Sequence, residues 1–450
     1  MTLATLLVDA AGAHGERPAL AHRGARISYR ELDAAAARAA GALRELGVGR
    51  GDRVAFVLPN EPASVAAYHG ALQLGAVVVP LNPLLRANEI GQRVADAGAV
   101  LLEPAGLDGP PVDAVASLAD EDAAVILYTS GTTGDPRRTE LTQGGLRRVT
   151  EYLARDALGL REDDVLFGCA PLAHVFGMTG CMNGALAAGA CLALVARFEP
   201  AAALEEIERE GVSVFMGVPA MCATLIAASE ATGRRPRLRL AHIGGAPLPV
   251  EVLAAFEERF GTVVLEGYGM TEAGGPLTTN HHDRQRKPGS VGTPAAGAEV
   301  RIAADGEVLV RASWLRGGHD GWLATGDVGR LDEDGYLFLL DRKKDVILRG
   351  GYTVYPREVE EALHHHPAVR EAVVLGVPHP TLGEEVVALV VLDGDADADD
   401  VKASVRERVA AYKYPRVVVA VDELPHGATG KVQRNAIDRN ALARLVARSS

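Results

Sequence analysis

Lysine is scarce in this chain of 450 residues. Only six of the 46 basic residues are lysines, and they lie at positions 287, 343, 344, 402, 413 and 431. Arginine stands almost everywhere else that a basic side chain is needed. Each lysine that remains is therefore more informative about function than a lysine usually is.

Cysteines and long apolar runs are also few. The four cysteines, at 169, 181, 191 and 222, lie in apolar surroundings without CxxC spacing, which predicts buried free thiols in a reducing cytosol. The longest apolar tract, around 184–196, is too short and too rich in glycine to span a membrane. The first residues carry no basic region ahead of their apolar stretch, so we expect no signal peptide.

The chain has no basic excess. Its net charge is −13 and its pI is about 5.5, which makes a sequence-independent grip on nucleic acid or on an anionic membrane unexpected. Hydrophobic residues make up 48% of the chain, so the material for a large core is present. A chain of this length predicts two or three domains.

Short apolar runs alternate with helical patterns through the first 270 residues or so, as in "AVVVPL", "VSVFMGVP" and "PAAALEEIEREG". Continuous apolar strands between helices predict parallel sheets covered on both faces. A helix is expected over Ser28–Leu46, with Ser28 and Glu31 at the spacing of a capping box. From about 298 the pattern becomes antiparallel, with a hairpin around Asp305–Gly306.

The predicted fold class is α/β: a large N-terminal domain of helix-covered, mostly parallel sheets with a small β-barrel-like part, and a small α+β C-terminal domain. The expected C-terminal elements are a helix at 357–366, strands near 371–376 and 385–392, and a helix at 398–411.

The segment "TSGTTG" (129–134) follows an apolar strand. Its hydroxyls and glycines are what a polyphosphate-binding loop requires, although a strand-to-helix turn uses the same residue types. The lysine of an NTPase P-loop is missing.

Four further motifs follow in order. "GYGMTEA" places Glu272 where a carboxylate could hold Mg²⁺, and "GWLATGD" ends in Asp327, a natural partner for ribose hydroxyls. Arg342 comes fifteen residues later, and Lys431 follows a flexible loop in "LPHGATGKVQR". Each motif alone is more often a turn or a solvated face, but the ordered set is hard to explain in that way.

This ordered set resembles the adenylate-forming superfamily of acyl-CoA synthetases, peptide-synthetase adenylation domains and luciferases, over essentially the whole chain. The resemblance implies an N-terminal domain at 1–341 and a mobile C-terminal domain at 342–450. It also implies that ATP and Mg²⁺ convert a carboxylic acid to acyl-AMP. The C-terminal domain then rotates, and a thiol, CoA in the first instance, takes the acyl group.

The resemblance assigns roles residue by residue. Lys431 would bridge the carboxylate and the α-phosphate, Glu272 and Thr132 would hold Mg²⁺, and Tyr268 would stack on adenine. Asp327 and Arg342 would hold the ribose. The full nucleotide-binding set is Thr129, Ser130, Gly131, Thr132, Thr133, Gly134, Arg137, Gly245, Ala246, Pro247, Glu266, Gly267, Tyr268, Gly269, Met270, Thr271, Asp327, Arg342 and Lys431.

The acyl group and the thiol have their own implied residues. His174 would gate the acyl pocket and is counted with the catalytic residues Lys431, Glu272 and Thr132. Lys344 would be the hinge. The pocket would be lined by His174, Phe176, Gly177, Met178, Val218, Gly244, Gly269 and Ala273, and the thiol tunnel by Arg349, Gly350, Gly351 and Tyr352.

Two positions depart from the family pattern. Pro136-Arg137-Arg138 stands where Pro-Lys-Gly is common, and Gln143 stands where a histidine is frequent. Arg137 keeps the charge and is expected on the phosphates, whereas Arg138 is expected to point to solvent or to pair with Glu140. The connections after "GAVLLEP" and "VRASWLRGGHD" are also shorter than is usual in the family.

The stretches expected to line the acyl pocket contain no arginine or lysine, which disfavours a dicarboxylate and suits an aliphatic, fatty or small aromatic acid. The pattern looks most like the fatty acyl-CoA synthetase branch. A carrier-protein phosphopantetheine remains an alternative acceptor to CoA. A non-catalytic nucleotide-binding relative, suggested by Arg138 and Gln143, remains a third reading.

Overall fold

The computed structural model describes residues 2–129, 137–315, 320–394, 396–427 and 432–449. The chain forms two compact units. The first comprises residues 1–248, 252–299 and 311–317, and the second comprises 249–251, 300–310 and 318–450. Each unit is described by itself.

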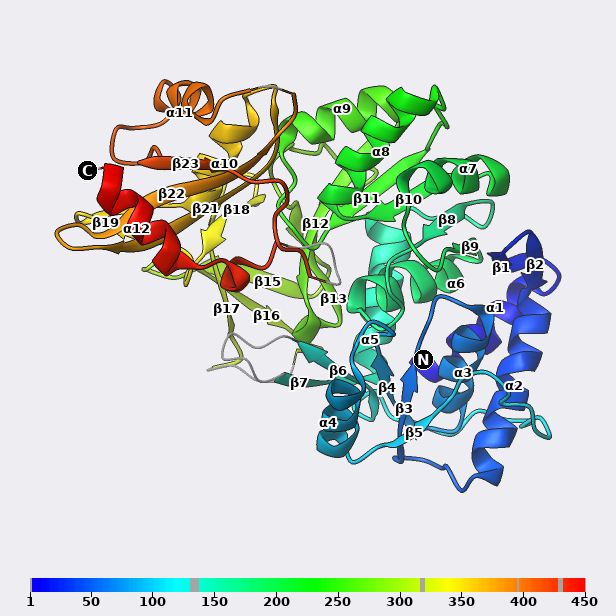
Figure 1. Ribbon diagram of the computed structural model, residues 1–450. Coiled ribbons are helices and arrows are strands. Elements are labelled where there is room, and N and C mark those ends of the chain that lie inside the picture. Colours follow the sequence, from blue (N-terminus) through cyan, green and yellow to red (C-terminus); the bar gives the residue numbers. More distant parts are fainter. Residues whose placement is uncertain (1, 130–136, 316–319, 395, 428–431, 450) are drawn as a thin grey trace. The chain divides into compact units, whose positions relative to one another are not determined.

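The first unit contains two sheets whose central strands run parallel (Figure 1). The larger sheet has the order β14 (Thr293–Pro294), β13 (Gly275–Thr279), β12 (Val263–Met270), β11 (Leu240–Gly244), β10 (Val214–Gly217), β8 (Val165–Gly168), β9 (Cys191–Leu194), β1 (Pro18–His22) and β2 (Ala25–Ser28). The smaller sheet has the order β5 (Val100–Leu102), β3 (Arg53–Val57), β4 (Val77–Leu81), β6 (Ala123–Thr129) and β7 (Arg137–Thr142).

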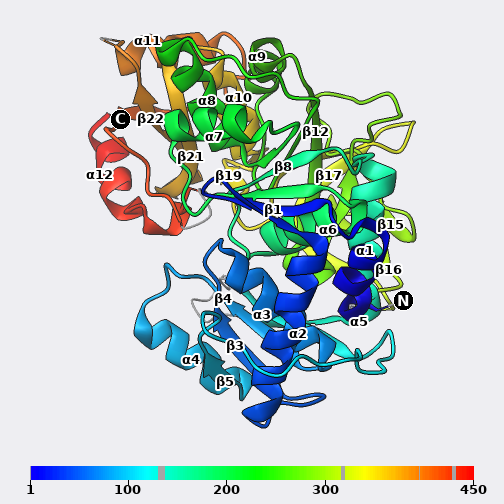
Figure 2. The ribbon, with the colours of Figure 1, turned by 90° about the vertical axis from the view of Figure 1, so that its right-hand side faces the viewer.

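Helices lie between the sheets and over their outer faces (Figures 1 and 2). Between them lie η1 (Leu3–Thr5), α1 (Leu6–His14), α2 (Tyr29–Glu45), α3 (Pro62–Gln73), α5 (Gln143–Glu151), the π-helical turns η2 (Tyr152–Ala157) and η3 (Phe176–Asn183), and α6 (Gly184–Ala188). The outer faces carry α4 (Ala87–Ala97) on the smaller sheet and α7 (Pro200–Glu210), α8 (Pro219–Thr232) and α9 (Val250–Phe260) on the larger.

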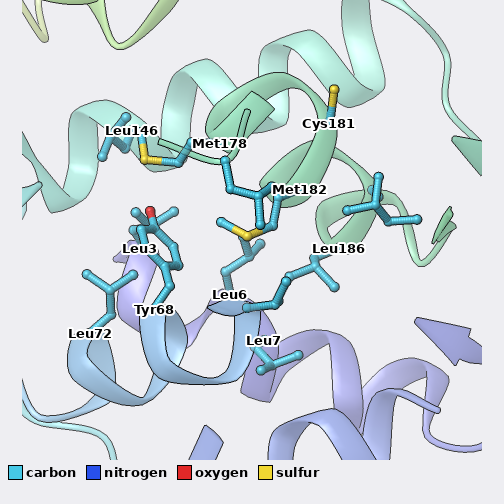
Figure 3. Packing of buried hydrophobic residues seen from close by; sticks show 14 of the residues in the cluster. Leu3, Leu6, Leu7, Tyr68, Leu72, Leu146, Met178, Cys181, Met182 and Leu186 are labelled. Carbon is cyan, nitrogen blue, oxygen red and sulfur yellow. The ribbon is translucent and has the colours of Figure 1, made fainter. Parts of the chain in front are cut away.

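The main core fills the space between the two sheets. Phe56 from the smaller sheet, Leu192 from the larger and Tyr68 from α3 belong to one buried cluster. Figure 3 shows Met178 and Met182 of η3 facing the same cluster. Both faces of each sheet are thus covered by apolar side chains, which is why the strand sequences read as continuous apolar runs.

Local sequence explains several helix ends. Proline occupies the first turn of α3, α7 and α8, where its missing N–H costs nothing. Glycine in the left-handed conformation follows α4 and α7, at Gly98 and Gly211. Ser28 and Glu31 form a complete capping box at the start of α2, so this prediction is confirmed.

The second unit holds the end of the chain and most of an antiparallel sheet. That sheet has the order β15 (Ala298–Ile302), β16 (Glu307–Ala312), β17 (Leu323–Leu331) and β18 (Leu337–Arg342). A further sheet has the order β20 (Tyr352–Val354), β19 (Ile347–Arg349), β22 (Gly383–Leu392) and β21 (Val369–His379), with β23 (Val417–Ala420) paired to β22. The helices are α10 (Pro356–His364), α11 (Ala398–Arg406), the short turn η5 (Arg434–Ala436) and α12 (Arg439–Ser449).

Side chains alternate across this last sheet. Val374 of β21 joins the core with α10 and α11, whereas its neighbours Val373 and Leu375 join the core with α12. Period-two alternation between two apolar layers requires both faces to be covered.

The predicted fold class is confirmed. The hairpin at Asp305–Gly306 is present, with Gly306 at a positive φ of 83°. Two predicted helices end early, at His364 and at Arg406. Residues after 406 form turns, in which Arg408 folds back onto Ser404 instead of continuing the helix. The domain boundary at 341–342 stays a prediction.

Candidate active site

Two glycines lie side by side where β11 ends against β12. Gly244 and Gly267 are paired across these two parallel strands. A Cβ added at Gly244 would stand 3.0 Å from the Gly267 carbonyl oxygen and 3.4 Å from a ring carbon of Phe176. Open α/β sheets bind their ligands beyond the carboxyl ends of the strands, so this edge is the candidate site in the first unit.

The turn after β11 is shaped by Gly245, which has a φ of 82°. Such a positive φ favours glycine over residues with a side chain. Ala246 is half-buried and Pro247 exposed, while Leu248 anchors the turn in the core. The turn expected to bind adenine is therefore accessible to solvent, while buried Leu248 holds it in place.

Phe176 and His242 stack over this edge. Their ring centroids are 5.7 Å apart and the ring planes differ by 7°. His242 is almost fully buried, and its Nδ1 lies 3.0 Å from the Leu265 carbonyl oxygen, so Nδ1 carries the proton and donates. Burial lowers the pKa of His242 to about 4. The imidazole is therefore neutral at physiological pH and adds no charge beside Phe176.

The loop after β8 positions His174. Asn60 holds this loop through its Nδ2, which donates to the carbonyls of Gly168 and Ala170, and through its Oδ1, which accepts the Leu172 amide. The Nδ1 atom of His174 accepts the Phe176 amide at 3.2 Å, which leaves the proton of a neutral ring on Nε2.

Gly177 and Met178, which follow Phe176 in η3, are both buried. A Cβ at Gly177 would fall 2.2 Å from the Pro171 carbonyl oxygen, so glycine is required for this close approach. Met178 is completely buried beside Tyr68 and Leu146 (Figure 3). Val218 is half-buried at the start of α8. Their assignment to the acyl pocket stays a prediction.

The run from Glu266 to Ala273 contains an irregularity in strand pairing between Tyr268 and Gly269, after which Gly269 and Met270 still pair with β13. Glu266 is buried, whereas Tyr268, Met270 and Thr271 are half-buried and Gly269 is exposed. A Cβ at Gly269 would lie 2.3 Å from the Gly275 carbonyl oxygen, which again restricts the position to glycine. Such a bulge increases the local twist of the strand just before β12 ends at Met270.

Glu272 lies in the short helical turn η4 (Thr271–Ala273) and is half-buried. Its carboxylate makes no hydrogen bond or ion pair with any residue that the structure describes. A single accessible carboxylate suits Mg²⁺, which is commonly held by one or two carboxylates together with substrate phosphates. Within the described ranges, no three acidic, histidine or cysteine side chains gather as a metal cluster.

Asp327 and Arg342 meet in the second unit. They are paired residues of β17 and β18, and Arg342 Nε lies 3.2 Å from Asp327 Oδ1. Asp327 is buried while Arg342 is exposed. The family resemblance assigned both residues to the ribose, and the structure brings them together; their role in binding ribose stays a prediction.

The expected phosphate loop is described only at its flanks. Ser130, Gly131, Thr132, Thr133 and Gly134 lie outside the described residues, as does Lys431. Thr129 and Arg137 pair across β6 and β7, so the two ends of the loop are held together.

Both departures from the family pattern have structural partners. Exposed Arg138 donates from Nη1 to the Asp96 carbonyl oxygen at 3.3 Å. Gln143 is fully buried, and its Oε1 accepts the Ala4 amide at 3.0 Å. Gln143 therefore anchors the first residues of the chain onto α5.

The expected hinge and thiol-tunnel residues belong to the second unit. Lys344 lies in the turn between β18 and β19. Arg349 forms a two-pronged ion pair with buried Glu385, at 2.5 and 3.0 Å. Gly350 and Gly351 both have positive φ, and the exposed ring of Tyr352 stacks on Tyr412 at a centroid distance of 4.6 Å.

Sequence reasoning missed Asn60, His242 and Asp341. Asn60 follows the apolar strand β3 and His242 lies within the apolar strand β11, and a lone polar residue at either place is a weak signal. Asp341 directly precedes Arg342, yet its partner is sixteen residues further along the chain. Only the fold brings such partners together.

Comparison with known proteins gives one consistent answer. Residues 7–105 and 103–313 match the AMP-binding enzyme family, and residues 358–431 match the AMP-binding enzyme C-terminal domain. A long-chain-fatty-acid–CoA ligase of Bacillus subtilis is 30% identical over 97% of this chain and 94% of its own length. A 2-succinylbenzoate–CoA ligase of Geobacillus kaustophilus is 36% identical over 92% of each chain.

Solved structures agree. The anthranilate–CoA ligase AuaEII, in complex with anthranoyl-AMP, has a TM-score of 0.90 and 26% identity, covering 99% of this chain and 98% of that one. The o-succinylbenzoate–CoA synthetase of Bacillus subtilis, in complex with ATP and a magnesium ion, has a TM-score of 0.84 and 30% identity, covering 96% and 98%.

The fold and the strand-end site therefore define an adenylate-forming enzyme, which activates a carboxylic acid through acyl-AMP. More particularly, the chain belongs to the AMP-binding enzyme family and, within it, to the AMP-forming acid–CoA ligases. No helix in the described part of the chain is long and apolar enough to cross a membrane.

Proposed function

We propose that this enzyme joins an uncharged aliphatic, fatty or small aromatic acid to CoA in two half-reactions. ATP and Mg²⁺ first convert the acid to acyl-AMP with release of pyrophosphate. The thiol of CoA then displaces AMP. The observation that carries the choice of acid is the edge at β11 and β12, whose described pocket residues include no arginine or lysine and where Phe176 stacks on a neutral His242 close to Gly244.

This edge explains why a second carboxylate on the substrate is disfavoured. A buried charge needs a partner of opposite sign. The described residues proposed for the pocket include no arginine or lysine, and His242 beside them is uncharged because its pKa is low. Glycine at 244 lets the Phe176 ring lie close to the backbone at the end of β11, because a Cβ there would stand 3.4 Å from a carbon of that ring.

For the first half-reaction we assign the phosphates to the segment 129–134 and Arg137, and Mg²⁺ to Glu272 with Thr132. When bound, Mg²⁺ supplies charge neutralisation at the phosphates. Asp327 and Arg342 would hold the ribose hydroxyls, since one carboxylate and one guanidinium already form a fixed pair there. Lys431 would supply a compact positive charge to the forming acyl phosphate bond.

For the second half-reaction we assign the hinge to Lys344 and the thiol tunnel to Arg349–Tyr352. The four buried, free cysteines fit a reducing compartment, and we propose the cytosol.

CoA is the preferred acceptor because the relatives named above are CoA ligases. A carrier-protein phosphopantetheine is the second candidate, and one observation favours testing it. The basic side chains that could meet the 3′-phosphate of CoA are Arg349, Lys413 and Arg416. Two of them already pair with carboxylates: Arg349 with Glu385, and Lys413 with Glu358 at 2.5 Å. Arg416 is the remaining candidate for the 3′-phosphate of CoA.

The test is acid-dependent pyrophosphate release with a panel of straight-chain, benzoic and dicarboxylic acids, followed by thioester formation with CoA, dephospho-CoA and a phosphopantetheinylated carrier protein. We expect release with monocarboxylic acids and thioester formation with CoA. Release with dicarboxylic acids alone would overturn the proposed substrate class. Thioester formation with the carrier protein alone would overturn CoA as the acceptor.

A further inference from the structure

The end of β18 is tied to the start of α10 by two hydrogen bonds, both donated by Arg357. Asp341 Oδ2 accepts the backbone N–H of Arg357 at 2.8 Å. Arg357 Nη1 in turn donates to the Leu339 carbonyl oxygen at 2.9 Å. All three residues belong to the second compact unit. We call Leu339, Asp341 and Arg357 the β18–α10 clasp.

The clasp is well satisfied and mostly shielded from water. Arg357 is buried, and its Nε also donates to Glu361 at 3.1 Å. Pro356 opens α10 without an N–H, so the Arg357 amide is the first free donor of the helix. A carboxylate at a helix N-terminus stabilises such a donor and the positive end of the helix dipole. Removing Asp341 would leave the amide without its partner.

The chain before Lys344 is anchored separately. Lys343 Nζ lies 2.7 Å from both Asp305 Oδ2 and Glu307 Oε2, and its amide donates to the Gly326 carbonyl oxygen at 2.9 Å. Position 343 is thereby fixed to the β15–β16 hairpin and to β17. Any rotation of the following segment must therefore begin after Lys343.

We infer that the β18–α10 clasp holds one of the two positions that the chain takes about Lys344, which makes Asp341 and Arg357 positioning residues for one half-reaction. This inference rests on the proposed function. The hydrogen bonds of the clasp join residues 339 and 341, which precede Lys344, to residue 357, which follows it. A rotation at Lys344 carries Arg357 away from Asp341, so the bonds exist in one position only. Contacts made in a single state shift the populations of the two states.

The experiment measures the two half-reactions separately. One assay follows acid-dependent acyl-AMP formation, and the other follows transfer from preformed acyl-AMP to CoA. The variants are Asp341→Ala, which removes the acceptor, and Asp341→Asn, which keeps an oxygen acceptor in place. Arg370→Met is the matched control, because exposed Arg370 pairs with Asp393 and lies outside the clasp.

The expected result is that Asp341→Ala changes the ratio of the two rates by about tenfold, as for the loss of one hydrogen bond to a charged group. Asp341→Asn should restore most of the ratio, and Arg370→Met should not change it. Arg357→Met is the second clasp variant, so the inference can still be tested if Asp341→Ala does not fold.

Equal changes in both half-reactions, or an unchanged ratio in a folded clasp variant, would overturn the inference. The wild-type enzyme separates this failure from failure of the proposed function. If the wild type catalyses both half-reactions while the clasp variants keep its ratio, only the clasp is wrong. If the wild type releases no pyrophosphate with any acid, the proposed function itself is wrong.

Discussion

Replacing Phe176 with alanine tests whether its ring closes the acyl pocket. The ring stacks on His242 and lies 3.4 Å from where a Cβ of residue 244 would be. Removing it opens space at the strand ends, and a longer acyl chain can bury additional methylene groups there. Each buried methylene contributes about 0.8 kcal/mol, which is roughly fourfold in kcat/KM. Two extra methylenes therefore predict a gain of about 15-fold for the longer acid.

The assay is kcat/KM for a series of straight-chain acids, from butanoic to dodecanoic, with ATP and CoA saturating. We expect the preferred chain length to increase in Phe176→Ala while the shorter acids lose efficiency. The stack itself is worth about 1 kcal/mol, so a modest loss of stability should accompany the change.

Phe198→Ala is the matched control. Phe198 is also a half-buried phenylalanine, but it packs against the core on the other face of the larger sheet. It should lower stability without changing the preferred acid. The reasoning is refuted if Phe176→Ala keeps the wild-type order of acids, or if Phe198→Ala changes that order equally.

Three further predictions concern the loop, the hinge and the clasp. Arg137→Ala should raise the KM for ATP several-fold, whereas Arg138→Gly should leave it unchanged, because adjacent residues of a strand point to opposite faces. Steady-state ATP kinetics that show the reverse would refute this prediction. Lys344→Pro should let acyl-AMP accumulate while thioester output falls, because proline fixes φ; unchanged thioester turnover would exclude the hinge. Burial raises the pKa of Asp341 from the ordinary 3.8 to about 6. Hydrogen bonds from the Arg357 and Arg342 amides and the charge of Arg434 lower this pKa, and the charge of Glu360 raises it, but burial has the largest effect. The native state therefore holds this proton more tightly, and the stability it contributes is present below pH ~4 and lost as pH rises to ~6. As the pH rises through that window, the free energy of unfolding of Asp341→Asn should increase relative to that of the wild type by up to about 3 kcal/mol, and its Tm should increase relative to the wild-type Tm. A difference in Tm that stays constant with pH would contradict the assignment.

The elements that the sequence predicted correctly are those set by local patterns. The capping box at Ser28 and Glu31 needs only residues three apart, and the hairpin at Gly306 needs only a residue that tolerates positive φ. Asp327 and Arg342 were assigned to the ribose by the family resemblance; the structure pairs them across β17 and β18, and their role stays a prediction.

The contacts that the sequence could not predict join distant segments. Gln143 looked like a departure from a catalytic pattern, yet it accepts a hydrogen bond from Ala4, 139 residues away. Arg138 was expected to face solvent or to pair with Glu140, and it is exposed but donates to the Asp96 carbonyl. Neither partner is visible in a local pattern, because it depends on how α4 and α5 pack in the fold.

The central claim is that one chain carries out two separable half-reactions, and Lys431→Ala tests it most directly. A single-turnover experiment with labelled ATP and a monocarboxylic acid measures acyl-AMP formation, and a parallel experiment starts from preformed acyl-AMP and CoA. The account predicts that the variant loses about 10²–10³ in the first rate, as for loss of one transition-state contact, and keeps the second. Equal loss in both rates, or wild-type acyl-AMP formation without Lys431, would contradict it.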